Sequence, residues 1–287
     1  MDHPNLNDLV ASTGKLATLP GTVIELLSLL GDATTCAEEV KAIIERDPAM
    51  TANVLKLGNS AFYGARRNIG SVRDALVLMG NRSVAALSFA TGMAPILRRG
   101  LVGYNLTRDQ FWSHSLIAGA AASEAIRQAG APHLCCDAFT AGLVHDIGML
   151  VIDPWLHQQS IVLETKGPEF GVCQQERECL GFDHCQAGAM LARDWGFPDT
   201  LVEPIAHHHD QEFKGIEAEI VRAVAAGNIM AEALDEEIES ESDPAVGEIL
   251  TELGYSYDLL EKVRLDLSTN LEQTLIRATS SVPVAVS

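Results

Sequence analysis

Apolar residues recur every three or four positions along most of this 287-residue chain, which is the spacing that buries one face of an α-helix. Residues 37–46 illustrate the pattern, because Val40, Ile43 and Ile44 share one face and charged residues occupy most of the rest. No segment stands out as a strand. Aromatic residues make up only 5% of the chain, and its plentiful Ala and Leu suit closely packed helices. The sequence therefore predicts an all-α fold, a multi-helix bundle.

Turn-forming and capping residues divide this pattern into separate helices. Thr34 and Thr35 are expected to cap one helix, and Asp47 followed by Pro48 is expected to begin the next. Helices are predicted at 22–30, 37–46, 47–60, 71–80, 82–93, 108–129, 136–152, 173–194, 199–209 and 216–234. Two more helices, at 244–254 and 257–267, are expected to close the fold.

The chain is long enough for one large or two modest domains. Residues 235–243 carry six acidic side chains and no basic one, so like-charge repulsion predicts a linker or a frayed helix end there. The expected division is an N-terminal helical lobe at 1–105, a helical core at 106–235, and an acidic linker with C-terminal helices and a tail at 236–287.

The formal net charge of −19 limits the kinds of partner. A chain this acidic repels a phosphate backbone, so direct binding of nucleic acid is not expected. The apolar run between Arg82 and Arg98 is too short and too mixed to span a bilayer, so no membrane interaction is expected either. The N-terminal residues M-D-H-P-N-L-N-D lack a signal-peptide pattern, which favours a cytoplasmic location.

The six cysteines include no C-x-x-C pair, as is typical of a reduced protein. Cys173, Cys179 and Cys185 recur at a spacing of six, and His184 precedes the last of them. Structural zinc ligands usually come in closer pairs, so these three are interpreted as thiols of the core rather than as a zinc site.

Histidines and one aspartate occupy positions where a helical core is expected. His145 and Asp146 lie side by side in the apolar stretch A-G-L-V-H-D-I-G-M-L-V-I, and both need partners if they are buried. His114, His184 and the run at 207–209 fall in other predicted helices, beside small residues that leave room around the ring. Such side chains converge on metal ions inside helical bundles. The alternative is that Asp146 accepts hydrogen bonds from the histidines, and the spacing alone leaves both interpretations open.

Several longer stretches resemble one family. They are L-A-T-L-P-G-T-V-I-E-L-L, I-I-E-R-D-P-A-M-T-A-N-V-L-K-L-G-N-S-A-F-Y-G, I-G-S-V-R-D-A-L-V-L-M-G, F-W-S-H-S-L, F-T-A-G-L-V-H-D-I-G-M-L, L-G-F-D-H and W-G-F-P, in this order. Over roughly 15–235 the chain resembles the HDOD domain, an output domain of bacterial signalling proteins related to the HD superfamily of metal-dependent phosphohydrolases. The resemblance implies an N-terminal helical lobe packed on an HD-like helical core.

The resemblance also implies a set of metal ligands. His114, His145 and Asp146 match ligands of the HD superfamily, whereas Asn228 stands where the final Asp is expected. Three further histidines, His184, His208 and His209, match ligands of the related HD-GYP phosphodiesterases. The candidate ligand set is therefore His114, His145, Asp146, His184, His208 and His209. The implied cofactor is a divalent metal, with Fe, Mn, Zn, Ni and Mg as candidates.

Two departures from the HD-GYP pattern bear on activity. Met149 replaces the Lys that follows H-D-I-G there, and the G-Y-P segment is missing. We therefore expect a regulatory domain with a degenerate HD-type site and no catalytic residues, acting by protein–protein interaction. Its expected partners are signalling proteins, an upstream sensor or receiver domain, or a second copy of the chain. The alternative is a metal-dependent phosphohydrolase of a nucleotide or cyclic nucleotide, and a weaker hypothesis is an iron- or redox-sensing site that includes Cys185.

Overall fold

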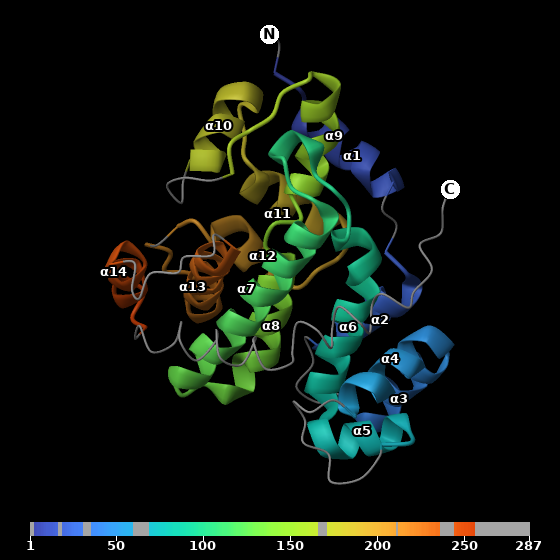
Figure 1. Ribbon diagram of the computed structural model, residues 1–287. Coiled ribbons are helices and arrows are strands. Elements are labelled where there is room, and N and C mark those ends of the chain that lie inside the picture. Colours follow the sequence, from blue (N-terminus) through green and yellow to red (C-terminus); the bar gives the residue numbers. More distant parts are fainter. Residues whose placement is uncertain are drawn as a thin grey trace. The chain divides into compact units, whose positions relative to one another are not determined.

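The computed structural model describes residues 3–16, 19–30, 36–59, 69–165, 171–210, 212–235 and 244–255. Within these ranges all regular secondary structure is helical, apart from one isolated β-bridge between Leu101 and Leu106 (Figure 1). The predicted all-α fold is confirmed.

The chain forms two compact units. Of the described residues, those at 3–16 and between 96 and 255 form one unit, and those between 19 and 95 form the other. The expected domain boundaries at residues 105 and 235 stay a prediction.

The unit formed by Leu19–Pro95 is built from short helices around an aliphatic core. It contains α2 (Gly21–Leu30), α3 (Ala37–Glu45), α4 (Pro48–Gly58), α5 (Val72–Met79) and most of α6 (Asn81–Leu97). The expected buried face of α3 is confirmed, since Val40, Ile43 and Ile44 are all buried. Asp47 caps α4 as predicted, because its Oδ1 accepts hydrogen bonds from the backbone N–H groups of Ala49 (2.9 Å) and Met50 (3.1 Å).

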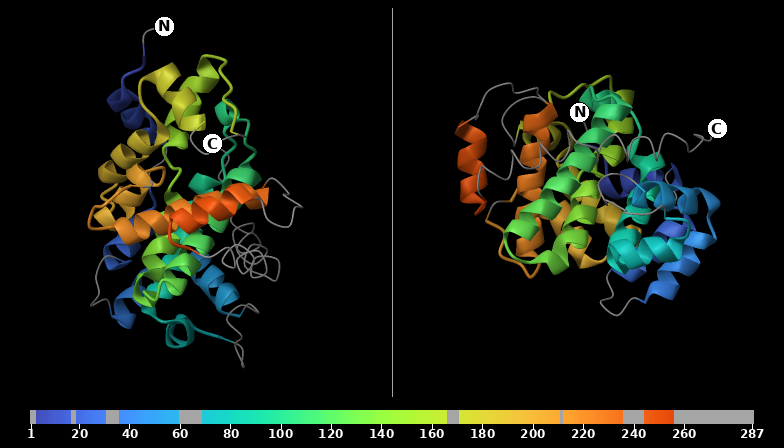
Figure 2. Two further views of the ribbon diagram at one scale, coloured as in Figure 1. Left: turned by 90° about the vertical axis from the view of Figure 1, so that its left-hand side faces the viewer. Right: turned by 60° about the horizontal axis from the view of Figure 1, so that its bottom comes forward.

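The larger unit holds the remaining helices. They are α1 (Leu6–Leu16), η2 (Val102–Tyr104), α7 (Arg108–Gln128), η3 (Pro132–Leu134), α8 (Cys135–Val144), α9 (Met149–Gln158), α10 (Gly171–Leu180), α11 (His184–Asp194), α12 (Asp199–His207), α13 (Ala218–Asp235) and α14 (Pro244–Glu252). Helix α7 is central and packs against both α8 and α13, as the views in Figure 2 also show.

Glycines let the central helices approach until their backbones touch. A Cβ added to Gly119 of α7 would lie 2.7 Å from the carbonyl oxygen of Phe139 in α8, and one added to Gly142 of α8 would lie 2.9 Å from the carbonyl oxygen of Ala118. On α13, a Cβ at Gly227 would collide with that same Ala118 oxygen. Because real Cβ atoms do not come so close to backbone atoms, these positions set the spacing of α7, α8 and α13.

Two segments expected to be single helices are each broken in two. The predicted helix at 136–152 is divided by residues 145–148, so α8 ends at Val144 and α9 begins at Met149. The predicted helix at 173–194 is divided at Gly181, whose φ of +84° is left-handed, and Asp183 then caps α11 by accepting the Gln186 N–H at 3.0 Å. The sequence-based prediction was wrong at both places, and helix α1 was not predicted.

Some expectations fall on residues outside the described ranges. They include the caps at Thr34 and Thr35, the acidic segment at 236–243 and the closing helix at 257–267. Within the described part, Pro132–Gln158 is long and apolar enough to cross a membrane, but 89% of its most apolar window is buried inside the protein. That burial identifies it as part of the core.

We expect Gly227→Ala to lower the free energy of unfolding of the larger unit by about 1–3 kcal/mol, because the added methyl group forces α13 away from α7. Denaturant unfolding followed by tryptophan fluorescence measures this, since Trp112, Trp155 and Trp195 all lie in this unit. Gly100→Ala is the control, because a Cβ there meets nothing closer than 3.7 Å. Equal unfolding midpoints for the two variants would contradict the proposed close approach.

Candidate metal centre

Five parts of the larger unit bring six polar side chains to one place, here called the Asp146 centre. Helix α7 carries one of them, the turn after α8 two, and α11, the end of α12 and α13 one each. All are buried except the first, whose side chain is 14% exposed. The six side chains are His114, His145, Asp146, His184, His208 and Asn228.

The carboxylate of Asp146 lies between two pairs of histidines. Its Oδ2 is 3.2 Å from Nε2 of His145 and 3.5 Å from Nε2 of His114. Its Oδ1 is 3.4 Å from Nε2 of His184 and 3.5 Å from Nε2 of His208. One carboxylate therefore faces four imidazole nitrogens, two through each oxygen.

The outer nitrogens of three of these rings are held by hydrogen bonds. Nδ1 of His145 donates to the carbonyl oxygen of Gly142 at 2.8 Å, and Nδ1 of His208 donates to that of Ile205 at 3.1 Å. A carbonyl oxygen can only accept, so both rings carry a proton on Nδ1 and turn Nε2 toward Asp146.

His184 is oriented in the same way by a buried carboxylate. Its Nδ1 lies 2.8 Å from Oε2 of Glu176, which also accepts the backbone N–H of His184 at 2.9 Å. The hydroxyl of Tyr104 donates to the other Glu176 oxygen at 2.6 Å. Because donors surround Glu176, it acts as an acceptor for the Nδ1 proton, and Nε2 of His184 faces inward.

Asn228 directs an oxygen toward the centre. Its Nδ2 donates to Oε1 of Glu232 at 3.0 Å, and this bond fixes which end of the amide faces which way. Oδ1 then lies 3.0 Å from Nε2 of His114 and 3.1 Å from Nε2 of His145. The amide oxygen thus takes the place expected for a carboxylate oxygen, without its charge.

The inward atoms of the centre are nitrogen and oxygen atoms that face one another. The Nε2 atoms of His184 and His208 are 3.3 Å apart, and those of His114 and His145 are 3.4 Å apart. Two nitrogen atoms this close share either a proton or a metal cation. The separations of 3.0–3.5 Å suit ligands that each bind a metal ion at about 2.0–2.2 Å. The donor set therefore fits a divalent metal.

The two oxygens of Asp146 divide the centre into two subsites. Oδ2 faces His114, His145 and the Asn228 oxygen, whereas Oδ1 faces His184 and His208. A carboxylate that presents one oxygen to each of two histidine pairs is placed as a bridging ligand would be. The same donor atoms could bind one ion or two.

The pKa values of two buried groups suit ligation. Burial alone would raise the pKa of Asp146, but the neighbouring histidines, His145 foremost, hold it well below its usual value. Burial, together with the nearby His209, lowers the pKa of His208 to about 3. An ionised carboxylate and a neutral imidazole at neutral pH are the protonation states that metal binding requires. His184 differs, because Glu176 overcomes the effect of burial and raises its pKa well above the usual value, so an ion must displace a proton from this ring.

The structure brings together five of the six side chains that were expected to bind metal, and it places Asn228 beside them. His209 is the exception: its ligand atom groups with those of Cys173, His184 and Cys185, on the other side of the His184 ring. Whether any of these side chains ligates an ion remains a prediction. Sequence reasoning missed Glu176 and Tyr104, because a buried acid in the E-R-E segment of α10 leaves no periodic signal.

A family model for the HDOD domain matches residues 16–211. The chain belongs to the HDOD domain family. That match includes five of the six residues of the Asp146 centre, and Asn228 lies beyond its end.

Solved structures share this HDOD fold. An HDOD domain protein of unknown function from Geobacter sulfurreducens is 24% identical, has a TM-score of 0.66, and is matched over 94% of this chain and 96% of that one. A protein from Shewanella amazonensis SB2B, whose name assigns it provisionally to the phosphohydrolases, is 23% identical with a TM-score of 0.70, over 96% and 98% of the two chains. At these identities the structures show the fold alone.

One curated relative is longer than the HDOD chain described here. An uncharacterized protein of Treponema pallidum (strain Nichols) is 24% identical over 233 residues, which is 79% of this chain and 44% of that relative. The chain thus spans less than half of that relative's length.

We expect His145→Ala to weaken the binding of Mn²⁺ by about tenfold or more, because it removes one inward lone pair beside Asp146. Elemental analysis of protein purified without chelator, together with calorimetric titration, measures this. His157→Ala is the control, since His157 is exposed on α9. If His145→Ala retains full affinity and stoichiometry, the Asp146 centre does not hold the ion.

We expect Asn228→Asp to tighten Mn²⁺ binding by about tenfold or more. A full negative charge at ligand distance contributes more than about 1.4 kcal/mol at an effective dielectric constant of about 20. Burial already raises the pKa of Glu232, so this neighbour can hold a proton and donate a hydrogen bond to the new carboxylate. The same calorimetric titration measures the change.

Asn105→Asp is the control for that experiment, because it adds the same charge at an exposed position with left-handed backbone. An unchanged affinity in Asn228→Asp would mean that the residue at 228 does not contact the ion.

Proposed function

We propose that this HDOD domain is a bacterial signal-transduction output module that acts by binding other proteins. In this proposal the Asp146 centre holds an ion for structure or regulation, and it does not catalyse hydrolysis. The observation that carries the proposal is the neutral oxygen of Asn228, which stands 3.0 Å from His114 and 3.1 Å from His145 where a charged ligand is expected.

The burial of the centre supports the same conclusion. His145, His184 and His208 are fully buried, and Asp146 is 5% exposed. A catalytic metal site keeps one coordination position open to water and substrate. Of the six side chains, His114 is the most exposed, at 14%, which leaves a nucleotide little access. The buried Met149 also occupies the position of the Lys found in HD-GYP enzymes.

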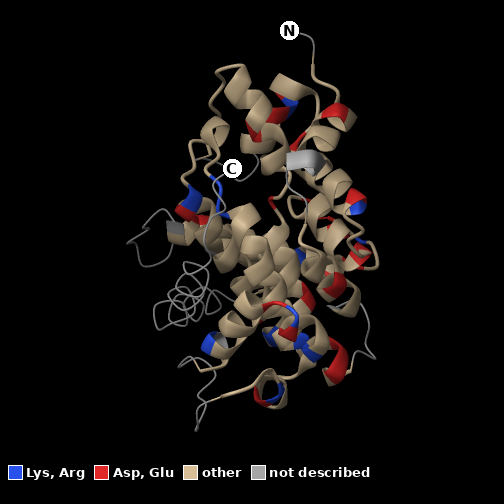
Figure 3. Cartoon of the chain, turned by 90° about the vertical axis from the view of Figure 1, so that its right-hand side faces the viewer, with Lys and Arg blue, Asp and Glu red and all other residues tan. Residues whose placement is uncertain are grey.

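Charge supports a protein partner over a nucleic acid. The chain carries 39 acidic and 20 basic side chains. In the view of Figure 3, basic positions are interspersed with acidic ones along the described helices. Such a surface does not attract a phosphate backbone. The proposed partner is a signalling protein, or a sensor or receiver domain that acts upstream.

Exposed apolar side chains supply candidate contact positions for that partner. Val77 on α5 is 80% exposed, and Val102 in η2 is 54% exposed. Each lies in a different unit, so they test the two units separately. Single exposed apolar residues are common, and these two serve as sites for probes.

A second candidate function is a metal-dependent phosphohydrolase of a nucleotide or cyclic nucleotide. The observation that favours it is the arrangement of Asp146, which faces two histidine pairs as a ligand of two ions would. An ion held there would supply Lewis acidity and a water of lowered pKa. The contribution of the chain would be to orient the histidines through Gly142, Ile205 and Glu176, and to admit substrate beside His114.

We expect the full chain loaded with Mn²⁺ or Fe²⁺ to release product from cyclic di-GMP, or from other nucleotides, no faster than His145→Ala does. Steady-state assays with chromatographic detection of products measure this. A turnover of about 1 s⁻¹ or more that His145→Ala abolishes would establish the enzyme and refute the regulatory proposal.

The same proposal has a positive test. A photo-crosslinking amino acid at Val77 or at Val102, in full chain expressed in cells of the source organism, should capture a signalling protein reproducibly. The control places the crosslinker at Val144, which is buried. If neither exposed position captures a signalling protein, binding through these two surfaces is refuted.

A further inference from the structure

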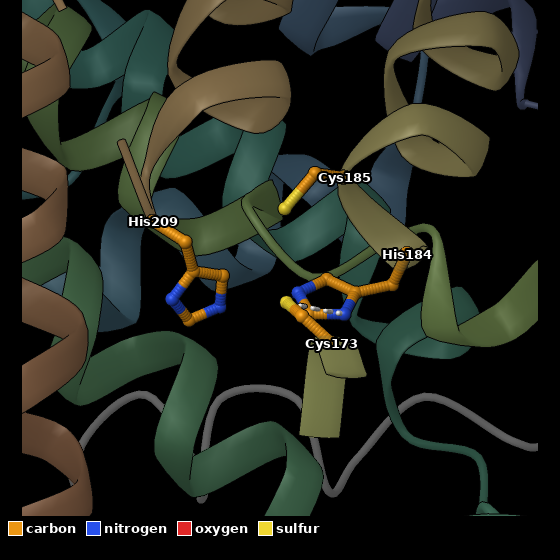
Figure 4. Close-up of side chains that lie close together, drawn as sticks. All are labelled: Cys173, His184, Cys185 and His209. Atoms are coloured by element: carbon orange, nitrogen blue, oxygen red, sulfur yellow. Dashed lines mark hydrogen bonds between the residues drawn. The ribbon is translucent and has the colours of Figure 1, made fainter. Parts of the chain in front are cut away.

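Two thiols and a histidine form a second cluster beside the Asp146 centre. Cys173 comes from α10, Cys185 from α11, and His209 from the segment after α12, and their side chains converge next to the ring of His184 (Figure 4). The ligand atoms of these four residues all lie within 4.8 Å of one another. We call Cys173, Cys185 and His209 the thiol cluster.

The thiol cluster lies beside the rings of His184 and His208. The Sγ atom of Cys173 is 3.9 Å from Nδ1 of His184, the nitrogen that faces away from Asp146. The Sγ atom of Cys185 is 3.9 Å from Nε2 and 4.0 Å from Nδ1 of His208. The cluster therefore borders the Asp146 centre without sharing its carboxylate.

Burial and access both suit a bound ion. Cys173 is 1% exposed and Cys185 is 5% exposed, so their sulfur atoms are shielded from solvent. Both cysteines are free thiols. His209 is only partly buried, which gives an ion a way in from the surface.

The donor atoms select a different ion from the one that suits the Asp146 centre. Thiolate and imidazole together favour soft or borderline cations such as Zn²⁺ and Cd²⁺, whereas a carboxylate and an amide oxygen also suit Mn²⁺ and Mg²⁺. Ligands of a tetrahedral zinc ion lie roughly 3.3–3.8 Å apart, as bond lengths of about 2.0–2.3 Å imply. The cluster, with atoms within 4.8 Å, is close to that size before any ion contracts it.

We propose that Cys173, Cys185 and His209 form a second metal site, which binds a soft divalent cation of the zinc group. Each thiol that binds the ion releases its proton to solvent, and His209 binds through a neutral ring nitrogen. The ring of His184 lies against the fourth side of the site and is not a ligand there. Its Nδ1 remains hydrogen-bonded to Glu176, and its Nε2 remains part of the Asp146 centre. This proposal is an alternative to the interpretation of these cysteines as thiols of the core.

The test titrates the full chain with Cd²⁺ and follows the ultraviolet charge-transfer band that thiolate–cadmium bonds produce. The band should saturate at one Cd²⁺ per chain and disappear in both Cys173→Ser and Cys185→Ser. Cys179→Ser is the matched control, because Cys179 lies on α10 with Cys173 but outside the cluster, and this variant should keep the band.

His209→Ala should weaken Cd²⁺ binding by about tenfold or more, since it removes one ligand. His207→Ala is its control, because His207 is two residues away and stacks on Phe213 instead. His145→Ala should keep the band, so loss of the Asp146 centre and loss of the thiol site are separate results.

A second measurement does not depend on the folding of the serine variants. The cadmium NMR shift of the wild-type chain should fall in the range for two sulfur ligands with nitrogen. A shift typical of oxygen and nitrogen ligands alone, the absence of a band, or a band that Cys179→Ser removes and Cys173→Ser keeps would each overturn the proposal.

Discussion

A single buried carboxylate organises the larger unit of this HDOD domain. Asp146 is 5% exposed, and a charge buried that deeply is costly unless it is compensated. The compensation comes from four histidines on four different parts of the chain, so the carboxylate requires α7, α11, α12 and the turn after α8 to meet at one point. The hydrogen bonds to Gly142, Ile205 and Glu176 fix the orientation of the His145, His208 and His184 rings, so that their Nε2 atoms face Asp146.

Small residues make that meeting geometrically feasible. The turn that carries Asp146 ends in Gly148, where a Cβ would collide with the backbone of α11 at His184. Gly188, one turn further along α11, faces the same turn: a Cβ there would lie 3.0 Å from the Gly148 nitrogen. The chain thus uses glycine where backbone must touch backbone, and the spacing of the polar side chains follows from that contact.

The all-helical fold class and most helix positions could be predicted from apolar periodicity, whereas the breaks at 145–148 and at Gly181 could not. Both breaks depend on contacts with distant elements, which a local pattern does not contain. The histidines and Asp146 could be found from the family motifs. Glu176 could not, because its role depends on its hydrogen bonds with Tyr104 and His184, which the sequence does not show. His209 was grouped with His208 because both match ligands of the HD-GYP phosphodiesterases. Successive residues in helical backbone point about 100° apart, so the two rings face different groups.

The Glu176 carboxylate also connects the interior with the surface. One of its oxygens holds His184 and the other holds the hydroxyl of Tyr104, the last residue of η2. The preceding residue of η2, Gly103, forms backbone hydrogen bonds with the Asp153 side chain and the Leu163 N–H group. Val102, which precedes Gly103, is exposed. A continuous series of hydrogen bonds and backbone therefore runs from the fully buried His184, through Glu176 and Tyr104, to the exposed Val102.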